Sequence, residues 1–304
     1  MKSHVFIILA HKQPKLLKRT ISVLANENHY FYVNVDLKTT NFNEFEEEVE
    51  GMPNVTFFRK SIYHCGISHL YALLYILNNA YESDQHFDYF HIISGQDYPL
   101  RSNEQFDSFF ESNNNESYMF FDDEAYRNRM SKELRIFAQQ WHMNKTTGVL
   151  YKIYNFFHMP RLLSIIAPRK PIEGYSSGWD WFSWHRDVVE YVLEYFETNP
   201  NYIKRYNHTL CPTEHIFHTI LEKKSDDLRI EKNNPLRYVS WTPHRDVDTE
   251  YRPFTLTEED YNFVIESKAF FCRKVEEMDS IKLLDMIDKQ RGQEYNITEH
   301  VNVM

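Results

Sequence analysis

Polar side chains follow three apolar runs in the first half of this sequence, at points where strands are expected to end. His11, Asp36 and Asp97 occupy these points. Strand ends and helix starts leave unpaired backbone donors and room for polar groups, so ligands of open α/β sheets bind there. A carboxylate at such a place can accept hydrogen bonds from sugar or ribose hydroxyl groups. Asp97 has a second interpretation, in which it only caps a helix that begins near Asn103.

A second candidate carboxylate lies at the expected start of a helix in the stretch Cys211–Phe217. Thr213 is the predicted N-cap, which puts Glu214 in the first turn of the helix. A helix N-terminus lowers the pKa of a carboxyl group, so we expect Glu214 to be ionised, as a general base must be. The alternative is that Glu214 only complements the helix dipole.

Cations gather late in the chain, at Arg252 and at the pair Arg273-Lys274. Paired cations near a nucleotide diphosphate can stabilise the charge of a departing group without a metal. The competing interpretation is ordinary ion pairing on the surface with the acidic neighbours Asp246, Glu250 and Glu276.

A metal site is not expected. Asp246-Val-Asp248 is an Asp-x-Asp string, but it lies in a polar stretch late in the sequence. At the strand end where such a string would hold a cation, Gln96-Asp97 offers a single carboxylate. One acid with neutral oxygens is a poor site for Mg²⁺ or Mn²⁺. We therefore expect no metal and no other cofactor.

Composition narrows the class of protein. The 304 residues are 42% hydrophobic, enough for a full core, and the formal charge of −10 argues against nucleic acid as a partner. No run reaches the roughly 18–20 apolar residues of a membrane span, and no signal peptide is evident. Cys65, Cys211 and Cys272 are far apart without CxxC spacing, which favours a reducing compartment and disfavours zinc. The sequence thus predicts a cytoplasmic protein.

Strands and helices alternate in the first half, which predicts a parallel sheet with right-handed crossovers and an α/β fold. The predicted strands are Val5–Ala10, Tyr30–Val35, Val55–Phe58 and Tyr89–Ile93, and the predicted helices are Pro14–Leu24, Phe42–Val49 and Ser68–Ala80. Because parallel strands end at one edge, His11, Asp36 and Asp97 should lie along that edge.

The second half is more mixed. Its predicted helices are Arg186–Phe196, Thr213–Lys223, Glu258–Ser267 and Ser280–Lys289, and its predicted strands are Trp181–Trp184, Arg237–Trp241 and Ala269–Phe271. The aromatic and apolar segment Leu150–Ile166 contains or adjoins the cations Lys152, Arg161, Arg169 and Lys170. It fits a peripheral contact with a membrane surface, an acceptor groove, or a core or lid helix.

Eight motifs occur in an order that resembles the core-2/I-branching β-1,6-N-acetylglucosaminyltransferase family, which includes the protein xylosyltransferases (glycosyltransferase family 14). They are Phe6-Ile-Ile-Leu-Ala-His11, Val33-Asn-Val-Asp36, Cys65-Gly-Ile-Ser68, Ser94-Gly-Gln-Asp-Tyr-Pro-Leu100, Gly178-Trp-Asp-Trp-Phe182, Pro212-Thr-Glu-His-Ile-Phe217, Val239-Ser-Trp241 and Phe270-Phe-Cys-Arg-Lys274. The resemblance covers about residues 4–276.

The resemblance implies a GT-A-type, Rossmann-like α/β fold with a mostly parallel central sheet flanked by helices. It also implies inverting transfer from a UDP-sugar to a glycan acceptor without a metal. The family's base falls on Glu214, and the residues that contact the donor fall on His11, Asp36, His64, Asp97, Arg252 and Lys274. Acceptor contacts fall on Trp181 and Trp241. The expected organisation is one domain over 1–276, with a nucleotide-binding half to about 120 and an acceptor half after it, followed by a C-terminal helix and tail over 277–304.

Three departures from the family bear on function. Thr213 replaces the Asp of an Asp-Glu pair, and residues 122–178 match no family motif. The membrane anchor and disulfides of the animal enzymes have no counterpart here, which predicts a bacterial member in surface-polysaccharide assembly. The expected function is transfer of a sugar, with N-acetylglucosamine expected, from a UDP-sugar donor to a glycan hydroxyl. The alternatives are a non-catalytic UDP- or carbohydrate-binding protein, and a metal-dependent GT-A transferase of another family that uses Asp246 and Asp248.

Overall fold

A seven-stranded sheet forms the centre of the computed structural model, which describes residues 1–138, 145–241 and 253–292. The strand order is β3-β2-β1-β4-β7-β6-β8. The first four in this order pair in parallel, whereas β7 runs antiparallel to both β4 and β6. The strands are β1 (His4–Ala10), β2 (His29–Val35), β3 (Val55–Phe58), β4 (Tyr89–Ser94), β6 (Ser117–Tyr118), β7 (Ser183–His185) and β8 (Ile230–Glu231). The predicted α/β class with a mostly parallel central sheet is confirmed.

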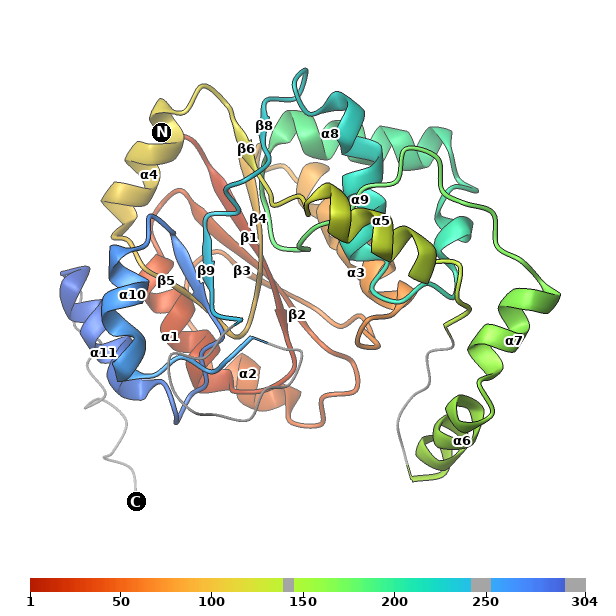
Figure 1. The fold of residues 1–304 in the computed structure, drawn as a ribbon. Helices are drawn as coiled ribbons and strands as arrows, with labels where there is room; N and C mark the ends of the chain where they lie inside the picture. The colour runs from red at the N-terminus through yellow and green to blue at the C-terminus, as the bar shows by residue number, and fades with distance from the viewer. Residues whose placement is uncertain (139–144, 242–252, 293–304) are drawn as a thin grey trace.

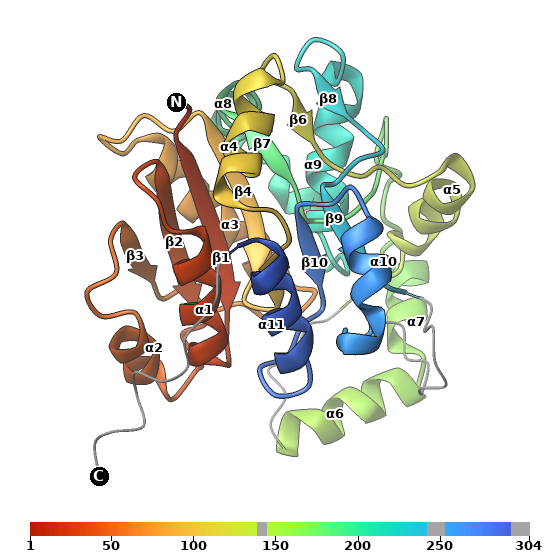
Figure 2. The same cartoon turned by 90° about the vertical axis from the view of Figure 1, so that its left-hand side faces the viewer.

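Helices cover both faces of this sheet (Figures 1 and 2). Side chains alternate along a strand, so Val5 and Ile7 of β1 join one core and Phe6 and Ile8 join the other. The first core is closed by α3 (Ile67–Tyr81), α8 (Arg186–Thr198) and α9 (Thr213–Leu221). The second is closed by α1 (Pro14–Leu24), α2 (Phe42–Glu48) and α4 (Asn103–Ser112).

A second sheet of three strands carries distant segments to the carboxyl end of β4. Its order is β5 (Asp97–Pro99), β10 (Phe271–Arg273) and β9 (Arg237–Val239), with Arg273 paired opposite Asp97. Two helices, α10 (Tyr261–Glu266) and α11 (Ile281–Gln290), pack against it through a third core. An ion pair between Arg19 of α1 and Asp288 of α11, at 2.7 Å, fixes α11 to the main body.

The segment Leu150–Ile166 forms two helices, α6 (Lys145–Phe156) and α7 (Met159–Ile166), that follow α5 (Glu124–Glu133). No residue of α7 is buried, so the interpretation of this segment as a core helix is wrong. Single 3₁₀ turns lie at Ile203–Tyr206, Glu222–Lys224 and Glu258–Asp260. Among the helices in the described ranges, none has the length and hydropathy needed to cross a bilayer.

Three second-half strands were predicted at the right places with shifted ends, whereas β8 was not predicted. The strand predicted at Trp181–Trp184 is Ser183–His185, and the one predicted at Ala269–Phe271 is Phe271–Arg273. Aromatic content favours β structure in sequence, but the ladder of hydrogen bonds to a partner decides where a strand begins. The shift brings Arg273 into register with Asp97.

Candidate active site

The structure places two predicted donor-binding residues, His11 and Asp36, directly after β1 and β2, and a third, His64, in the segment after β3. The backbone N–H of Asp36 donates to the Ala10 carbonyl at 2.9 Å, so the two strands end side by side. Partial loss of solvent lowers the pKa of His11, and the charge of Lys12 lowers it further, while Asp36 opposes these effects. His64 also contributes, so these groups are close enough for their charges to interact.

The Asp36 carboxylate holds the segment that carries His64. It accepts hydrogen bonds from Lys38 Nζ at 2.7 Å and from the Ile62 backbone N–H at 3.3 Å. These contacts tie the chain after β3 to the end of β2. The result is a polar surface at the carboxyl edge of the sheet, where ligands of open α/β sheets bind.

Two lysines converge on one glutamate beside this edge. Lys12 Nζ lies 2.9 Å and Lys274 Nζ lies 3.6 Å from Glu276 Oε1. The Gln96 side chain also donates to this carboxylate. The predicted ion pair of Lys274 with Glu276 therefore occurs. Because Lys12 pairs with the same carboxylate, Glu276 brings the two lysines together at one place. Lys12 belongs to the polar cluster expected at the end of the first strand, directly after His11, but no role in donor binding was predicted for it.

Asp97 is buried beneath Arg273 and does not face the open edge. Its side chain is 1% exposed and accepts a hydrogen bond from Arg273 Nη1 at 3.0 Å. The Arg273 guanidinium in turn lies over the Trp181 ring, 4.0 Å from the centroid. The interpretation of Asp97 as a helix cap is wrong, because the Ser102 side chain caps α4. Asp97 positions the Arg273–Trp181 stack, and a direct donor contact remains a prediction.

Glu214 lies in the first turn of α9, as predicted, but its environment differs from the prediction in two respects. Pro212 is the N-cap, and the Thr213 hydroxyl instead donates to Asp180 Oδ2 at 3.0 Å. The pKa of Glu214 is raised well above its ordinary value, first by burial and then by the negative charge of Asp180. The prediction of a lowered pKa is wrong because these effects outweigh the helix N-terminus.

A pair of cysteines joins the starts of α3 and α9 next to Glu214. The Cys211 backbone N–H donates to the Cys65 carbonyl at 2.9 Å, and the two thiols are hydrogen-bonded. Both cysteines are reduced, and the hydrogen bond from Cys211, followed by one from His64, lowers the pKa of Cys65 to about 5. Their separation of well over a hundred residues hid this contact from sequence reasoning.

The Gly178-Trp-Asp-Trp-Phe182 motif forms the wall of the site nearest α9. The Gly178 N–H donates to the Glu214 carbonyl at 3.0 Å, and a Cβ at Gly178 would overlap the Phe120 carbonyl oxygen and the His218 ring. The motif therefore lies directly against α9, and it brings Asp180 beside Thr213. Asp180 was missed as a site residue, although it stands next to Trp181 in a recognised motif.

An aromatic surface continues this wall. The ring of Trp179 lies 4.6 Å from that of Phe120 and 6.1 Å from that of Trp241, measured between centroids. Trp241 is 51% exposed, as a platform for stacking on a sugar ring would be. Trp181, the other predicted acceptor contact, packs against Arg273. Trp179 was missed.

Arg252, Asp246 and Asp248 lie outside the described residues. Within the described ranges, one group has metal-ligand geometry, namely His4, His29 and Asp107. It lies at the opposite edge of the sheet, where β1 and β2 begin. His4 Nδ1 is 3.0 Å from His91 Nε2 and His29 Nε2 is 2.8 Å from Asp107 Oδ1, so both rings have protein partners. This group belongs to the core rather than to the candidate site.

A mostly parallel sheet with cations and carboxylates at its carboxyl edge defines an α/β protein with a candidate site where ligands of such sheets bind. The family model described as "Branch: Core-2/I-Branching enzyme" matches residues 5–265. The chain belongs to this family of glycosyltransferases.

Among curated relatives, Xylosyltransferase 1 of Rattus norvegicus is 25% identical over 305 residues, covering 93% of this chain and 35% of the relative. Xylosyltransferase 2 of Homo sapiens is 25% identical over 302 residues, covering 93% and 33%. The chain thus spans about a third of the length of these relatives. Among solved structures, apo mouse Xyloside xylosyltransferase 1 matches with a TM-score of 0.42 and 8% identity, over 90% of this chain and 97% of that one.

Proposed function

We propose that this protein is an inverting glycosyltransferase that moves a sugar, with N-acetylglucosamine expected, from a UDP-sugar to a hydroxyl group of a glycan acceptor. One observation carries the proposal: Glu214 is a partly buried carboxyl group with a raised pKa, and it opens a helix beside an aromatic wall. A raised pKa makes the ionised carboxylate a stronger base toward the acceptor hydroxyl.

In the proposed reaction, Glu214 accepts the proton of the acceptor hydroxyl while the acceptor oxygen forms a bond to the anomeric carbon. The bond from that carbon to the UDP oxygen breaks, and its electron pair leaves with the diphosphate. Attack from the face opposite UDP inverts the anomeric configuration. The proposed acceptor platform is the exposed ring of Trp241 next to Trp179.

The cations at the sheet edge suit the charge of the departing diphosphate. Lys12 and Lys274 converge at Glu276. Arg252 is proposed from the family resemblance as a further contact to the diphosphate. Preorganised positive charge of this kind can replace a metal ion. His11, Asp36 and His64 are proposed to contact the uridine. Asp97 and Arg273 are proposed to hold Trp181 in place along the cleft.

The position of Asp180 bears on the non-catalytic alternative. Thr213 stands where the family has an Asp, which was the sequence feature in favour of a binding protein without activity. The hydrogen bond from Thr213 to Asp180 supplies a carboxylate beside Glu214 from another segment of the chain. This arrangement supports a working acid–base site. We further propose that the protein acts in a bacterial cytoplasm, in surface-polysaccharide assembly.

The deciding experiment is calorimetric titration of UDP in excess EDTA, followed by measurement of UDP release from UDP-sugars. The expected result is binding and turnover without metal. Lys274→Ala should weaken UDP binding, and the exposed Lys268→Ala serves as a control. UDP binding without turnover of any donor would favour the non-catalytic alternative. Activity that requires Mn²⁺ and is lost on alanine substitution of Asp246 and Asp248 would favour the metal-dependent one.

A further inference from the structure

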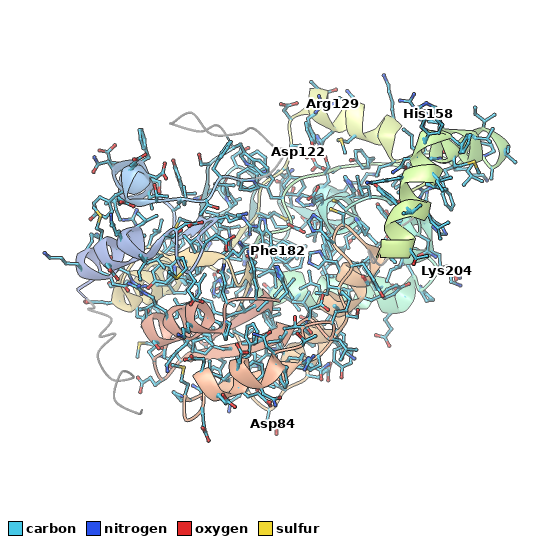
Figure 3. All side chains as sticks on the ribbon, turned by 90° about the horizontal axis from the view of Figure 1, so that it is seen from below. Asp84, Asp122, Arg129, His158, Phe182 and Lys204 are labelled. Carbon is cyan, nitrogen blue, oxygen red and sulfur yellow. The ribbon has the colours of Figure 1, made fainter. Side chains whose placement is uncertain are left out.

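The helices α6 and α7 follow one another at an angle, and this pair, called the hairpin below, projects from the body of the protein (Figures 1 and 2). Seen from below, His158 at the turn between them lies at the periphery, whereas Phe182 lies at the centre of the molecule (Figure 3). The Ser164 hydroxyl accepts a hydrogen bond from the Phe137 backbone N–H at 2.8 Å, which ties α7 to the chain after α5. The rest of the hairpin is largely open to solvent.

The hairpin exposes large apolar side chains that a globular protein would ordinarily bury. Phe156 and Ile165 are each 77% exposed and Ile166 is 70% exposed. In α6, Val149, Ile153 and Phe156 follow a spacing of three and four residues and therefore share one face of the helix. A contiguous exposed apolar surface of this kind marks an interaction site.

The charge of this part of the chain is opposite to that of the protein as a whole. No Asp or Glu occurs from Leu134 to Ile172, whereas this stretch contains six Lys and Arg residues. The complete chain has a formal charge of −10. The exposed cations Lys152 and Arg161 lie on the hairpin next to the apolar side chains. An apolar face bordered by cations is the pattern of helices that lie in the surface of an anionic membrane.

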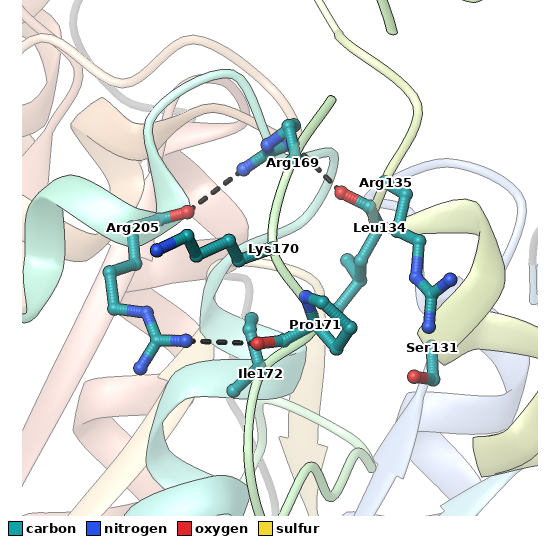
Figure 4. A pocket seen from close by; sticks show the side chains of 8 residues that line it. All are labelled: Ser131, Leu134, Arg135, Arg169, Lys170, Pro171, Ile172 and Arg205. Carbon is teal, nitrogen blue, oxygen red and sulfur yellow. Dashed lines mark hydrogen bonds between the residues drawn. The ribbon is translucent and has the colours of Figure 1, made fainter. Parts of the chain in front are cut away.

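A basic cavity of about 340 Å³ lies at the base of the hairpin (Figure 4). Arg135, Arg169, Lys170 and Arg205 line it, and no acidic residue does. Arg169 donates to the carbonyl groups of Leu134 and Arg205, each at 2.8 Å, and among the described residues no carboxylate forms an ion pair with it. Such a cavity suits a phosphate group.

We infer that the α6–α7 hairpin binds the surface of an anionic lipid bilayer, with its apolar face among the acyl chains and a lipid phosphate in the basic cavity. A second copy of the chain is a less suitable partner for the hairpin, because two such hairpins would repel each other. A bilayer supplies both an apolar layer and the negative charge that match the two surfaces.

Membrane binding would present the candidate active site to the bilayer. In Figures 1 and 2, α6 lies at the end of the molecule toward which β1 and β2 point, which is the end that carries the candidate site. If the protein is a glycosyltransferase as proposed, its acceptor would be a glycan attached to a membrane lipid. Only this statement about the acceptor rests on the proposed function. Vesicle binding itself needs neither donor nor acceptor, so its measurement is independent of the proposed activity.

The test is flotation of the full chain with vesicles of phosphatidylcholine alone and of phosphatidylcholine mixed with phosphatidylglycerol. We expect binding to the mixed vesicles that weakens at high salt. The double variant Phe156→Asp/Ile165→Asp should abolish it. Met278→Asp is the matched control, because Met278 is also 77% exposed but lies outside the hairpin. Lys152→Glu/Arg161→Glu should lower the partition onto mixed vesicles by on the order of 10-fold or more, against Lys268→Glu as control.

Three outcomes would overturn the inference. The first is that the wild-type chain does not float with mixed vesicles. The second is that Met278→Asp loses binding as fully as the hairpin variant. The third is that sedimentation velocity shows a dimer that Phe156→Asp dissociates, which would make a second copy the partner. Circular dichroism of each variant checks folding, which surface substitutions should leave intact.

Discussion

The Thr213 hydroxyl and the Asp180 carboxylate are joined by a hydrogen bond of 3.0 Å that spans two segments of the site. The contact holds a negative charge beside Glu214, and that charge is the second cause, after burial, of the raised pKa of Glu214. The Thr213 hydroxyl thus holds the Asp180 carboxylate where its charge helps to raise the pKa of Glu214, the proposed base.

Replacing Asp180 should shift the pH dependence of the reaction. The carboxylate form of Glu214 is the active form, so kcat/KM falls as pH falls through a pKa that lies above the ordinary value for Glu. Asp180→Asn removes a negative charge that disfavours ionisation, so the acidic limb should move to lower pH. The limb is measured from pH profiles of donor hydrolysis or transfer. Asp84→Asn, at an exposed position, serves as a control. If the acidic limb of Asp180→Asn stays at the wild-type pH, Asp180 does not raise the pKa of Glu214.

Removing the carboxylate at position 214 should affect chemistry and not donor binding. Glu214→Gln keeps the size and hydrogen bonding of the side chain but cannot accept the proton, so kcat should fall by about 10²–10⁴. Calorimetry should find UDP affinity nearly unchanged. The substitution Glu197→Gln, at an exposed position of α8, controls for the loss of one charge. Equal losses of affinity and rate would mean that Glu214 has a structural role.

Lys12 and Lys274 should act together on the diphosphate. Lys274→Ala removes one charge-assisted contact and should weaken UDP binding by about 10- to 100-fold. Lys12→Ala should act in the same direction, because both ammonium groups converge at Glu276. Uridine binding should change little in either variant, since it has no phosphate. A matching loss for uridine and UDP would place these lysines away from the diphosphate.

Local sequence patterns predicted the sheet and its edge well. The apolar runs that became β1 and β2 are buried on both faces, and such strands read directly as continuous apolar stretches. The start of α1 was also predicted, because Pro14 favours the first turn of a helix. These features depend on neighbours in sequence, which is why position and type were correct.

Contacts between segments that are distant in the sequence could not be predicted from local patterns. In the sequence, Asp97 follows an apolar run and is expected at an open strand end. In the fold, Arg273 of β10, 176 positions away, donates to Asp97 and covers its carboxylate. Likewise, a helix N-terminus alone lowers the pKa of Glu214, and only the folded chain adds Asp180 and burial to reverse the sign. Charge environment is a property of tertiary packing, so site chemistry was predicted less well than site position.

A side chain at Gly178 should disturb the wall of the site. In Gly178→Ala the Cβ would overlap the Phe120 carbonyl oxygen and the His218 ring, both of which are held by the core. We expect a loss of stability of about 1–3 kcal/mol, measured by denaturant unfolding, together with reduced activity. Gly51→Ala is the comparison, because no atom lies within 4 Å of its added Cβ and only its backbone conformation resists. Equal stability losses in both variants would contradict the steric explanation.

Cys65 should be the most reactive thiol of the chain. Its pKa, lowered to about 5 by the hydrogen bonds from Cys211 and His64, makes it a thiolate at neutral pH. Iodoacetamide near pH 7, read by peptide mass spectrometry, should label Cys65 well before Cys211 and the buried Cys272. Cys211→Ala removes the larger cause of the low pKa, so the labelling profile of Cys65 should move to higher pH. Protection of Cys65 by UDP would support His64 as a donor contact, and labelling of Cys272 before Cys65 would refute the assignment.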